Sequence, residues 1–126
     1  MPVTHEIRGA VVVIELIGDY SRQDIVTELV RAAAEPLFRE GSAVLIDTRS
    51  SLTYLSAGEI EARIEIFASL HRLGYGNRIA AVVPEDQRHR VEALSHFVAS
   101  LVARGRDARL FMERVSAEEW LSLSRA

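Results

Sequence analysis

Short runs of aliphatic and β-branched residues, separated by longer segments with helical periodicity, constrain the fold of this chain most strongly. Four such runs cover residues 10–17, 43–47, 78–83 and 108–112. The first three are apolar at almost every position, which predicts strands buried on both faces of a sheet. Residues 3–7 alternate apolar and polar side chains before Gly9, so we expect them to form a hairpin with the first run.

Helix start and stop signals lie between these runs. Ser21 with Asp24 and Ser56 with Glu59 have the spacing of capping boxes, and residues 116–119 have the same pattern near the end of the chain. Pro36 and the glycines at 74 and 105 are typical of positions that follow a helix. We therefore expect helices over residues 21–35, 56–73 and 86–103, and a terminal helix from 116.

The predicted order of elements is β-β-α-β-α-β-α-β-α. Strands that are separated by a helix pair in parallel through right-handed crossovers. The fold class we expect is α/β, with a mixed, mostly parallel five-stranded sheet and four helices. A chain of 126 residues has the size of one domain, so we expect a single domain over residues 1–126.

Composition excludes several kinds of chemistry. The chain has no cysteine, and all 15 of its cationic side chains are arginine. Disulfides, thiol nucleophiles, cysteine zinc sites, lysine Schiff bases and lysine-containing phosphate loops are therefore absent. A net charge of −3 argues against a nucleic-acid partner. No segment has the pattern of a signal peptide or the apolar length for stable membrane insertion, so we expect a cytoplasmic protein.

Acidic residues follow the predicted strands. Asp19, Asp47 and Asp86 lie at or just after strand ends, where open α/β sheets bind ligands. Their oxygens could hold Mg²⁺, and a metal-dependent enzyme is one reading of them. Aspartate also commonly caps turns and helix starts, and we prefer that reading. Since no nucleophile motif accompanies the aspartates, we expect no catalytic residues, no metal and no cofactor.

The histidines divide into two cases when residues are placed about 100° apart around a helix. His89, Glu92 and His96 share one face of the third helix, opposite its apolar side, which predicts a solvated stripe rather than a metal site. His71 falls on the apolar side of the second helix, so we expect a histidine in the core.

The second helix also carries a second row of apolar residues. Ala62, Ile66 and Leu73 lie apart from the main apolar side, so the helix has more apolar surface than contact with a sheet requires. This row could pack against a neighbouring helix, a partner protein or an apolar ligand. The sequence leaves these three alternatives open.

The succession of elements resembles the SpoIIAA-like proteins, relatives of the STAS domains of anti-sigma-factor antagonists. The resemblance covers nearly the whole chain and rests on residues 16–18, 44–47, 80–84, 109–112 and 117–121. It implies a non-enzymatic domain that binds protein partners. Many STAS domains are switched by phosphorylation of a serine in an Asp-Ser-Ser-Gly stretch. The matching position is Ser56, although Leu55 and Ala57 depart from that pattern, and Ser56 is also explained as a helix cap.

We therefore expect a non-catalytic regulatory or protein-interaction module. Its interaction surface would include Asp47, Tyr54 and the row formed by Ala62, Ile66 and Leu73. The partner would be another protein or a second copy of the chain in a homodimer. A carrier of a small apolar ligand, such as a lipid, is the alternative function, and a metal-dependent enzyme using Asp47 and Asp86 ranks third.

Overall fold

A computed structural model of the chain describes residues 2–123. They contain one five-stranded sheet in which the strands lie in their order along the chain. The first two strands are antiparallel and the following three add in parallel: β1 (Val3–Arg8), β2 (Val11–Leu16), β3 (Ala43–Asp47), β4 (Arg78–Val82) and β5 (Asp107–Phe111). The predicted mixed, mostly parallel sheet is confirmed. The single domain expected over residues 1–126 is described over residues 2–123, and its two ends lie outside the described residues.

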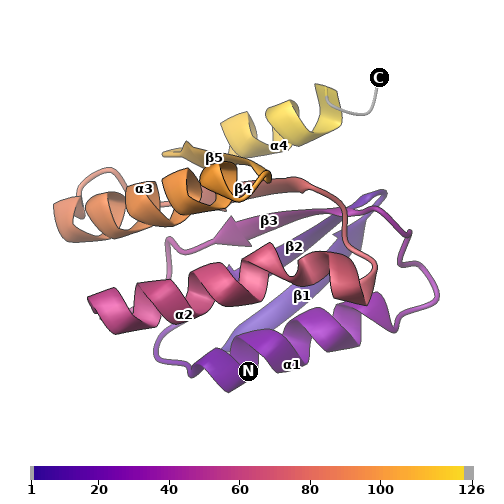
Figure 1. Cartoon of the computed structure of the whole chain (residues 1–126), viewed down its shortest axis with the longest axis horizontal. Coiled ribbons are helices and arrows are strands. Elements are labelled where there is room, and N and C mark those ends of the chain that lie inside the picture. Colours follow the sequence, from indigo (N-terminus) through magenta and orange to yellow (C-terminus); the bar gives the residue numbers. More distant parts are fainter. Residues whose placement is uncertain (1, 124–126) are drawn as a thin grey trace.

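Three of the four helices lie on one face of the sheet (Figure 1). They are α1 (Arg22–Ala33), α2 (Ala57–Ala68) and α3 (Arg88–Ala103). Each connects two adjacent parallel strands, and every connection moves in the same direction across the sheet. Right-handed crossovers then place all three helices on the same side. The fourth helix, α4 (Arg114–Leu123), follows the last strand and packs on the other face, against β3, β4 and β5.

The strands alternate their side chains between two apolar clusters. Val12, Ile14 and Leu16 of β2 face the three crossover helices, whereas Val11 and Val13 face the side of α4. Every residue from Ala43 to Asp47 of β3 is buried. The apolar runs at 11–14 and 43–46 therefore serve both clusters, which confirms that these strands are buried on two faces.

Several helix boundaries differ from the predictions: α1 ends at Ala33 instead of residue 35, and α3 begins at Arg88 instead of residue 86. The sequence predicts one helix over residues 56–73. In the structure α2 ends at Ala68, and the chain continues as a 3₁₀ helix, Leu70–Leu73. Gly74 follows in a left-handed conformation (φ 97°). Gly74 ends the helical segment as expected, because glycine adopts positive φ without strain. The last helix begins at Arg114, so the prediction that it starts at Ser116 is wrong. None of the helices in the described residues is long and apolar enough to cross a membrane.

Candidate binding surface at the carboxyl edge of the sheet

The loop over residues 48–56 joins the carboxyl end of β3 to the start of α2. In open α/β sheets, ligands bind outside the carboxyl ends of the strands, where the strand order reverses. The strand order of the described sheet has no reversal, so the surface at this edge is formed by the loop itself. Backbone hydrogen bonds hold the loop against the segment that follows β2. Gly18 N donates to Ser50 O (2.8 Å), Leu52 N donates to Gly18 O (2.8 Å), and Tyr20 N donates to the Thr53 hydroxyl (3.2 Å). The loop is thus a fixed part of the fold.

Two large apolar side chains of this fixed loop face solvent. Leu52 is 74% exposed and Tyr54 is 70% exposed, whereas Ser51 and Leu55 beside them are buried. The Tyr54 ring stacks on the His89 ring of α3, with centroids 4.8 Å apart and planes 7° apart. The buried neighbours therefore anchor the loop while Leu52 and Tyr54 project from it. We call Leu52, Tyr54 and His89 the loop surface.

A shallow groove runs along the loop surface between the loop and the start of α3. Three of the side chains that line it are basic or ionisable to a cation (Arg88, His89 and Arg90), and none is acidic. The lining residues are Leu52, Thr53, Tyr54, Leu55, Gln87, Arg88, His89 and Arg90. The groove therefore combines apolar contact area with positive charge.

Ser56 lies beside this surface as the N-cap of α2. Its hydroxyl accepts a hydrogen bond from Glu59 N at 3.2 Å, and its side chain is exposed. The predicted N-cap is confirmed, but only the serine half of the expected capping box forms, and the Glu59 carboxylate pairs with Arg22 at 3.1 Å. A phosphate on Ser56 would meet the positive end of the α2 dipole.

Asp47 is buried on the other face of the sheet from α2. Its carboxylate accepts two hydrogen bonds from Arg49 Nε and one from Arg49 Nη2, at 2.8–3.2 Å, and one from Arg49 N. Arg114 Nη1 approaches it to 3.4 Å. Burial acts to raise the pKa of Asp47, but the bonds and charge of Arg49, with the charge of Arg114, hold it below its ordinary value. Asp47 is therefore covered, and its carboxylate is occupied by arginines of the same chain.

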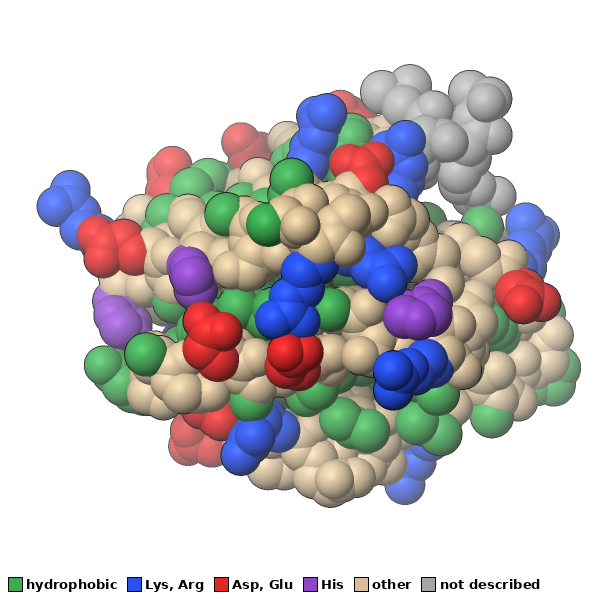
Figure 2. Space-filling model, viewed as in Figure 1, with side chains coloured by type: hydrophobic (Ala, Val, Ile, Leu, Met, Phe, Trp, Pro, Cys, Tyr) green, Lys and Arg blue, Asp and Glu red, His purple; other side chains and the backbone are tan. Residues whose placement is uncertain are grey.

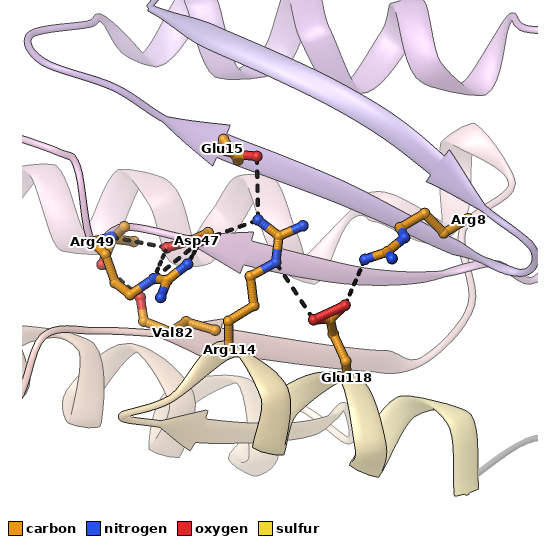
Figure 3. A network of polar contacts seen from close by, with 8 residues as sticks. Arg8, Glu15, Asp47, Arg49, Val82, Arg114 and Glu118 are labelled. Atoms are coloured by element: carbon orange, nitrogen blue, oxygen red, sulfur yellow. Dashed lines mark hydrogen bonds and ion pairs between the residues drawn. The ribbon is translucent and has the colours of Figure 1, made fainter.

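Arg114 extends this polar network across the sheet (Figure 3). Arg114 also pairs with Glu15 of β2 (3.2 Å) and with Glu118 of α4 (3.7 Å), and Glu118 pairs with Arg8 of β1. The network covers the part of the sheet that lies beside α4. It joins the first and last elements of the chain, which indicates a structural role.

The structure does not bring the aspartates at the strand ends together. Asp19 and Asp86 are exposed while Asp47 is enclosed by arginines. His89, Glu92 and His96 are exposed along α3, so the predicted solvated stripe is confirmed. Within residues 2–123, no group of three histidine, aspartate or glutamate side chains is placed to hold a metal ion.

The second apolar row of α2 is largely covered by the protein itself. Ala62 and Ile66 are half-buried, and Ile66 packs against the main core, while Leu73 is 37% exposed at the end of the 3₁₀ helix. Charged side chains gather along the boundary between α2 and α3, as Figure 2 shows, and include the pairs His96–Glu61 and Arg104–Glu65. Among the alternatives left open by the sequence, packing within the chain accounts for most of the row.

The prediction that His71 lies in the core is wrong. His71 is exposed, and its Nδ1 lies 3.0 Å from Arg106 Nη2. The placement assumed 100° per residue along one continuous helix. Because α2 ends at Ala68 and the chain tightens into a 3₁₀ helix, that rotation no longer applies at position 71.

The sequence interpretation missed two buried arginines. Arg63 of α2 and Arg90 of α3 are only 4% and 9% exposed, although charged side chains normally face solvent. A signal was present: on a helical wheel Arg63 falls about 40° from Phe67, and Arg90 about 20° from Leu101, both within apolar sectors. Their charge, taken as evidence of exposure, concealed this placement.

An internal cavity lies beneath α2, next to Arg63. Its volume is about 20 Å³, which is room for about one water molecule. A lipid chain needs far more space, so this cavity lends no support to a lipid carrier.

Comparison with known proteins identifies no relatives: no family model matches the chain, and no curated protein matches its sequence.

Proposed function

We propose that this protein is a non-catalytic interaction module that binds a protein partner through the loop surface. The observation that carries the proposal is the exposure of Leu52 and Tyr54 on a loop that the backbone holds in place. Large exposed apolar side chains are common on flexible segments, but here ordering them for binding costs little, because the loop is already fixed. Tyrosine is also enriched among residues that dominate binding energy.

The chemistry of the groove favours one kind of partner. Arg88, His89 and Arg90 line it without an acidic neighbour in the lining. An apolar anchor packed against Leu52 and Tyr54, with an acidic side chain beside it, would match both the apolar and the charged part of this surface. The partner is therefore a protein segment that carries a carboxylate next to an apolar residue.

The order of elements also supports a proposed place among the SpoIIAA-like, STAS-related proteins, whose members bind proteins. The described strands and helices follow the order on which that resemblance rests. Self-association remains the competing arrangement, since a second copy of the chain could offer its own acidic residues.

Site-specific photo-crosslinking in the native cell tests the proposal. A photoreactive phenylalanine analogue replaces Leu52 in one variant and Leu37 in a control. Leu37 is 72% exposed and follows α1, at the opposite, amino edge of the parallel strands. We expect a discrete crosslinked protein from position 52 and none of that species from position 37. A crosslink only between copies of this chain would replace the proposal with self-association, and equal background at both positions would refute it.

The affinity of the captured partner then measures the contribution of each residue. Tyr54→Ser should weaken binding by tenfold or more, which corresponds to about 1.4 kcal/mol or more. Arg88→Glu should weaken it further by reversing charge in the groove, whereas Leu37→Ser should leave it unchanged. Binding that is unaffected by Tyr54→Ser would place the contact elsewhere.

We also propose Ser56 as the residue through which the module is regulated. A phosphate there would add negative charge close to a groove lined by basic side chains, and it would compete with an acidic partner. Mass spectrometry of the protein from its native cell under varied growth conditions should detect phosphoserine at position 56. An unmodified Ser56 under every condition would remove this part of the proposal.

A further inference from the structure

A second groove adjoins the loop surface, between the N-terminal halves of α2 and α3. Its volume is about 280 Å³, more than ten times that of the internal cavity, and it is open to solvent. Leu55 and His89 line this groove and also the groove beside the loop, so the two grooves are neighbours. We call the second groove the α2–α3 groove, and the first one, which Arg88 and Arg90 line, the basic groove.

The α2–α3 groove has an apolar floor. Leu55 and Ile60 line it and are only 4% and 3% exposed, and Ala93, which also lines it, is half-buried. Ala57, the first residue of α2, is exposed at the same groove and is too small to fill it. A long side chain that lies in the groove therefore packs its stem against apolar atoms, which favours binding because it removes apolar surface from water.

Two carboxylates line the α2–α3 groove, and no arginine does. Glu61 and Glu92 are each the fifth residue of their helix, and both are exposed. The effect of a helix dipole is confined to about the first turn, so the positive ends of α2 and α3 do not neutralise these carboxylates. Glu61 Oε1 lies 2.9 Å from His96 Nε2, whereas Glu92 forms no ion pair within residues 2–123, including with Arg88 one turn earlier. The Glu92 carboxylate is therefore available to pair with a cation of a partner.

The two neighbouring grooves thus carry opposite charge. Arg88 and Arg90 line the basic groove without a carboxylate, whereas Glu61 and Glu92 line the α2–α3 groove without an arginine. Arginine and lysine pack their aliphatic stems on apolar surface while their charged heads remain in water. A side chain of this kind therefore matches both the apolar floor of the α2–α3 groove and the free carboxylate beside it.

We infer that the α2–α3 groove binds an arginine or lysine side chain of the same partner segment whose carboxylate lies in the basic groove. This inference rests on the proposed function and adds a cationic group to the partner. Arg88 and Glu92 are one helical turn apart in α3, about 6 Å along its axis, so the two charges of the partner are separated by a similar distance. The partner segment then binds in one direction only, because reversing it would place like charges together.

Charge reversal at Glu92 tests the inference with the partner that the crosslink from position 52 identifies. In calorimetry with the purified partner, Glu92→Lys should weaken binding by about tenfold or more. Glu119→Lys makes the same change of charge at an exposed residue of α4, on the opposite face of the sheet, and should leave the affinity unchanged. Each arginine or lysine of the crosslinked partner segment is then replaced by glutamate. One of these replacements should restore binding to Glu92→Lys and weaken binding to the wild type.

The outcomes separate this inference from the proposed function. If Tyr54→Ser weakens binding but Glu92→Lys does not, or if no replacement in the partner restores the loss, the inference falls and the proposed function stands. If position 52 captures no partner, both fall. Where Glu92→Lys fails to fold, a photoreactive phenylalanine analogue at Ala57 decides: it should capture the same partner in the native cell, and its failure to do so would overturn the inference.

Discussion

At the scale of single residues, His5 of β1 links the edge strand to α1. Its Nδ1 lies 2.5 Å from the carboxylate of Glu28, which is buried, and its Nε2 contacts the carboxylate of Glu35. A histidine donates from both ring nitrogens only when it is protonated. Partial burial acts to lower the pKa of His5, but the hydrogen bonds and charges of the two carboxylates outweigh it and raise the pKa above 6.5.

This arrangement predicts a pH dependence of stability. Because the folded-state pKa of His5 lies above its unfolded value, the contribution of the protonated ring is complete below about pH 6.5 and is lost as pH rises through the folded-state pKa. The free energy of unfolding, measured by urea denaturation from pH 6 to pH 9, should therefore decrease with pH. His5→Gln should flatten that decrease. A wild-type curve with the same slope as the variant would contradict the assignment.

Asp47 gives a second prediction at this scale. Replacement by asparagine keeps its shape but leaves Arg49 and Arg114 without their shared carboxylate. Since Asp47 is buried while Arg49 is partly exposed, we expect Asp47→Asn to lower the free energy of unfolding by about 1–3 kcal/mol. The contribution of Asp47 is present above its unfolded pKa, near 3.8, and is lost as pH falls through the lower folded-state value.

The control for Asp47 is Asp107→Asn. Asp107 pairs with Arg78 at 3.3 Å, and both side chains are more than a third exposed. Pairs of this kind contribute little, so the control should change stability by less than about 0.5 kcal/mol. Equal losses of unfolding free energy in the two variants would contradict the claim that the buried network around Asp47 contributes more than an exposed ion pair.

At the scale of the elements, two glycines predict opposite effects of the same substitution. A Cβ on Gly76 would lie 2.3 Å from Gly41 O, where the chain entering β4 passes close to the chain entering β3. Hydrogen bonds hold both segments there, since Gly41 N donates to Gly74 O and Gly76 N donates to Ser42 O. Gly76→Ala should therefore destabilise the protein by about 1–3 kcal/mol.

Gly58 is the matched case in the first turn of α2. A Cβ there meets no atom within 4 Å, and its φ is not positive. Gly58→Ala should raise the free energy of unfolding by up to about 1 kcal/mol, because alanine favours the helix and restricts the unfolded chain. Denaturation of both variants checks the pair. A tolerated Gly76→Ala would show that the two segments can separate without cost.

The elements were predictable where local patterns determine them. The mostly apolar runs at 43–47 and 78–83 and the serine caps at 21 and 56 are local signals, and β3, β4, α1 and α2 begin where those signals lie. The segment after Ala68 was not predictable by rotation around one helix, because its 3₁₀ geometry depends on packing before Gly74. Arg63 and Arg90 escaped notice for another reason: the helical wheel placed both within apolar sectors, but their charge was taken as evidence of exposure.

At the scale of the whole molecule, each of the three crossover helices begins at the carboxyl edge of the sheet and ends at the amino edge. The loop surface and the buried arginines both lie at the carboxyl edge, although they come from segments up to 40 residues apart. The sequence suggested an interaction surface formed by the second apolar row of α2 together with Tyr54 and Asp47. Of these, Tyr54 is strongly exposed beside Leu52, whereas most of the row is covered and Asp47 is buried. Which segments become exposed depends on the assembled fold, and the apolar pattern of one helix does not contain that information.

The binding footprint of the captured partner tests the central claim most directly. Amide chemical shifts of the ¹⁵N-labelled chain should change in one connected patch over residues 49–56 and 86–90 when the partner is added, and Leu52→Ser with Tyr54→Ser should abolish the changes while the melting temperature stays the same. Shifts confined to α4 or to the segment around Leu37, or a patch that survives the double substitution, would contradict the claim that this protein binds its partner at the carboxyl edge of its sheet.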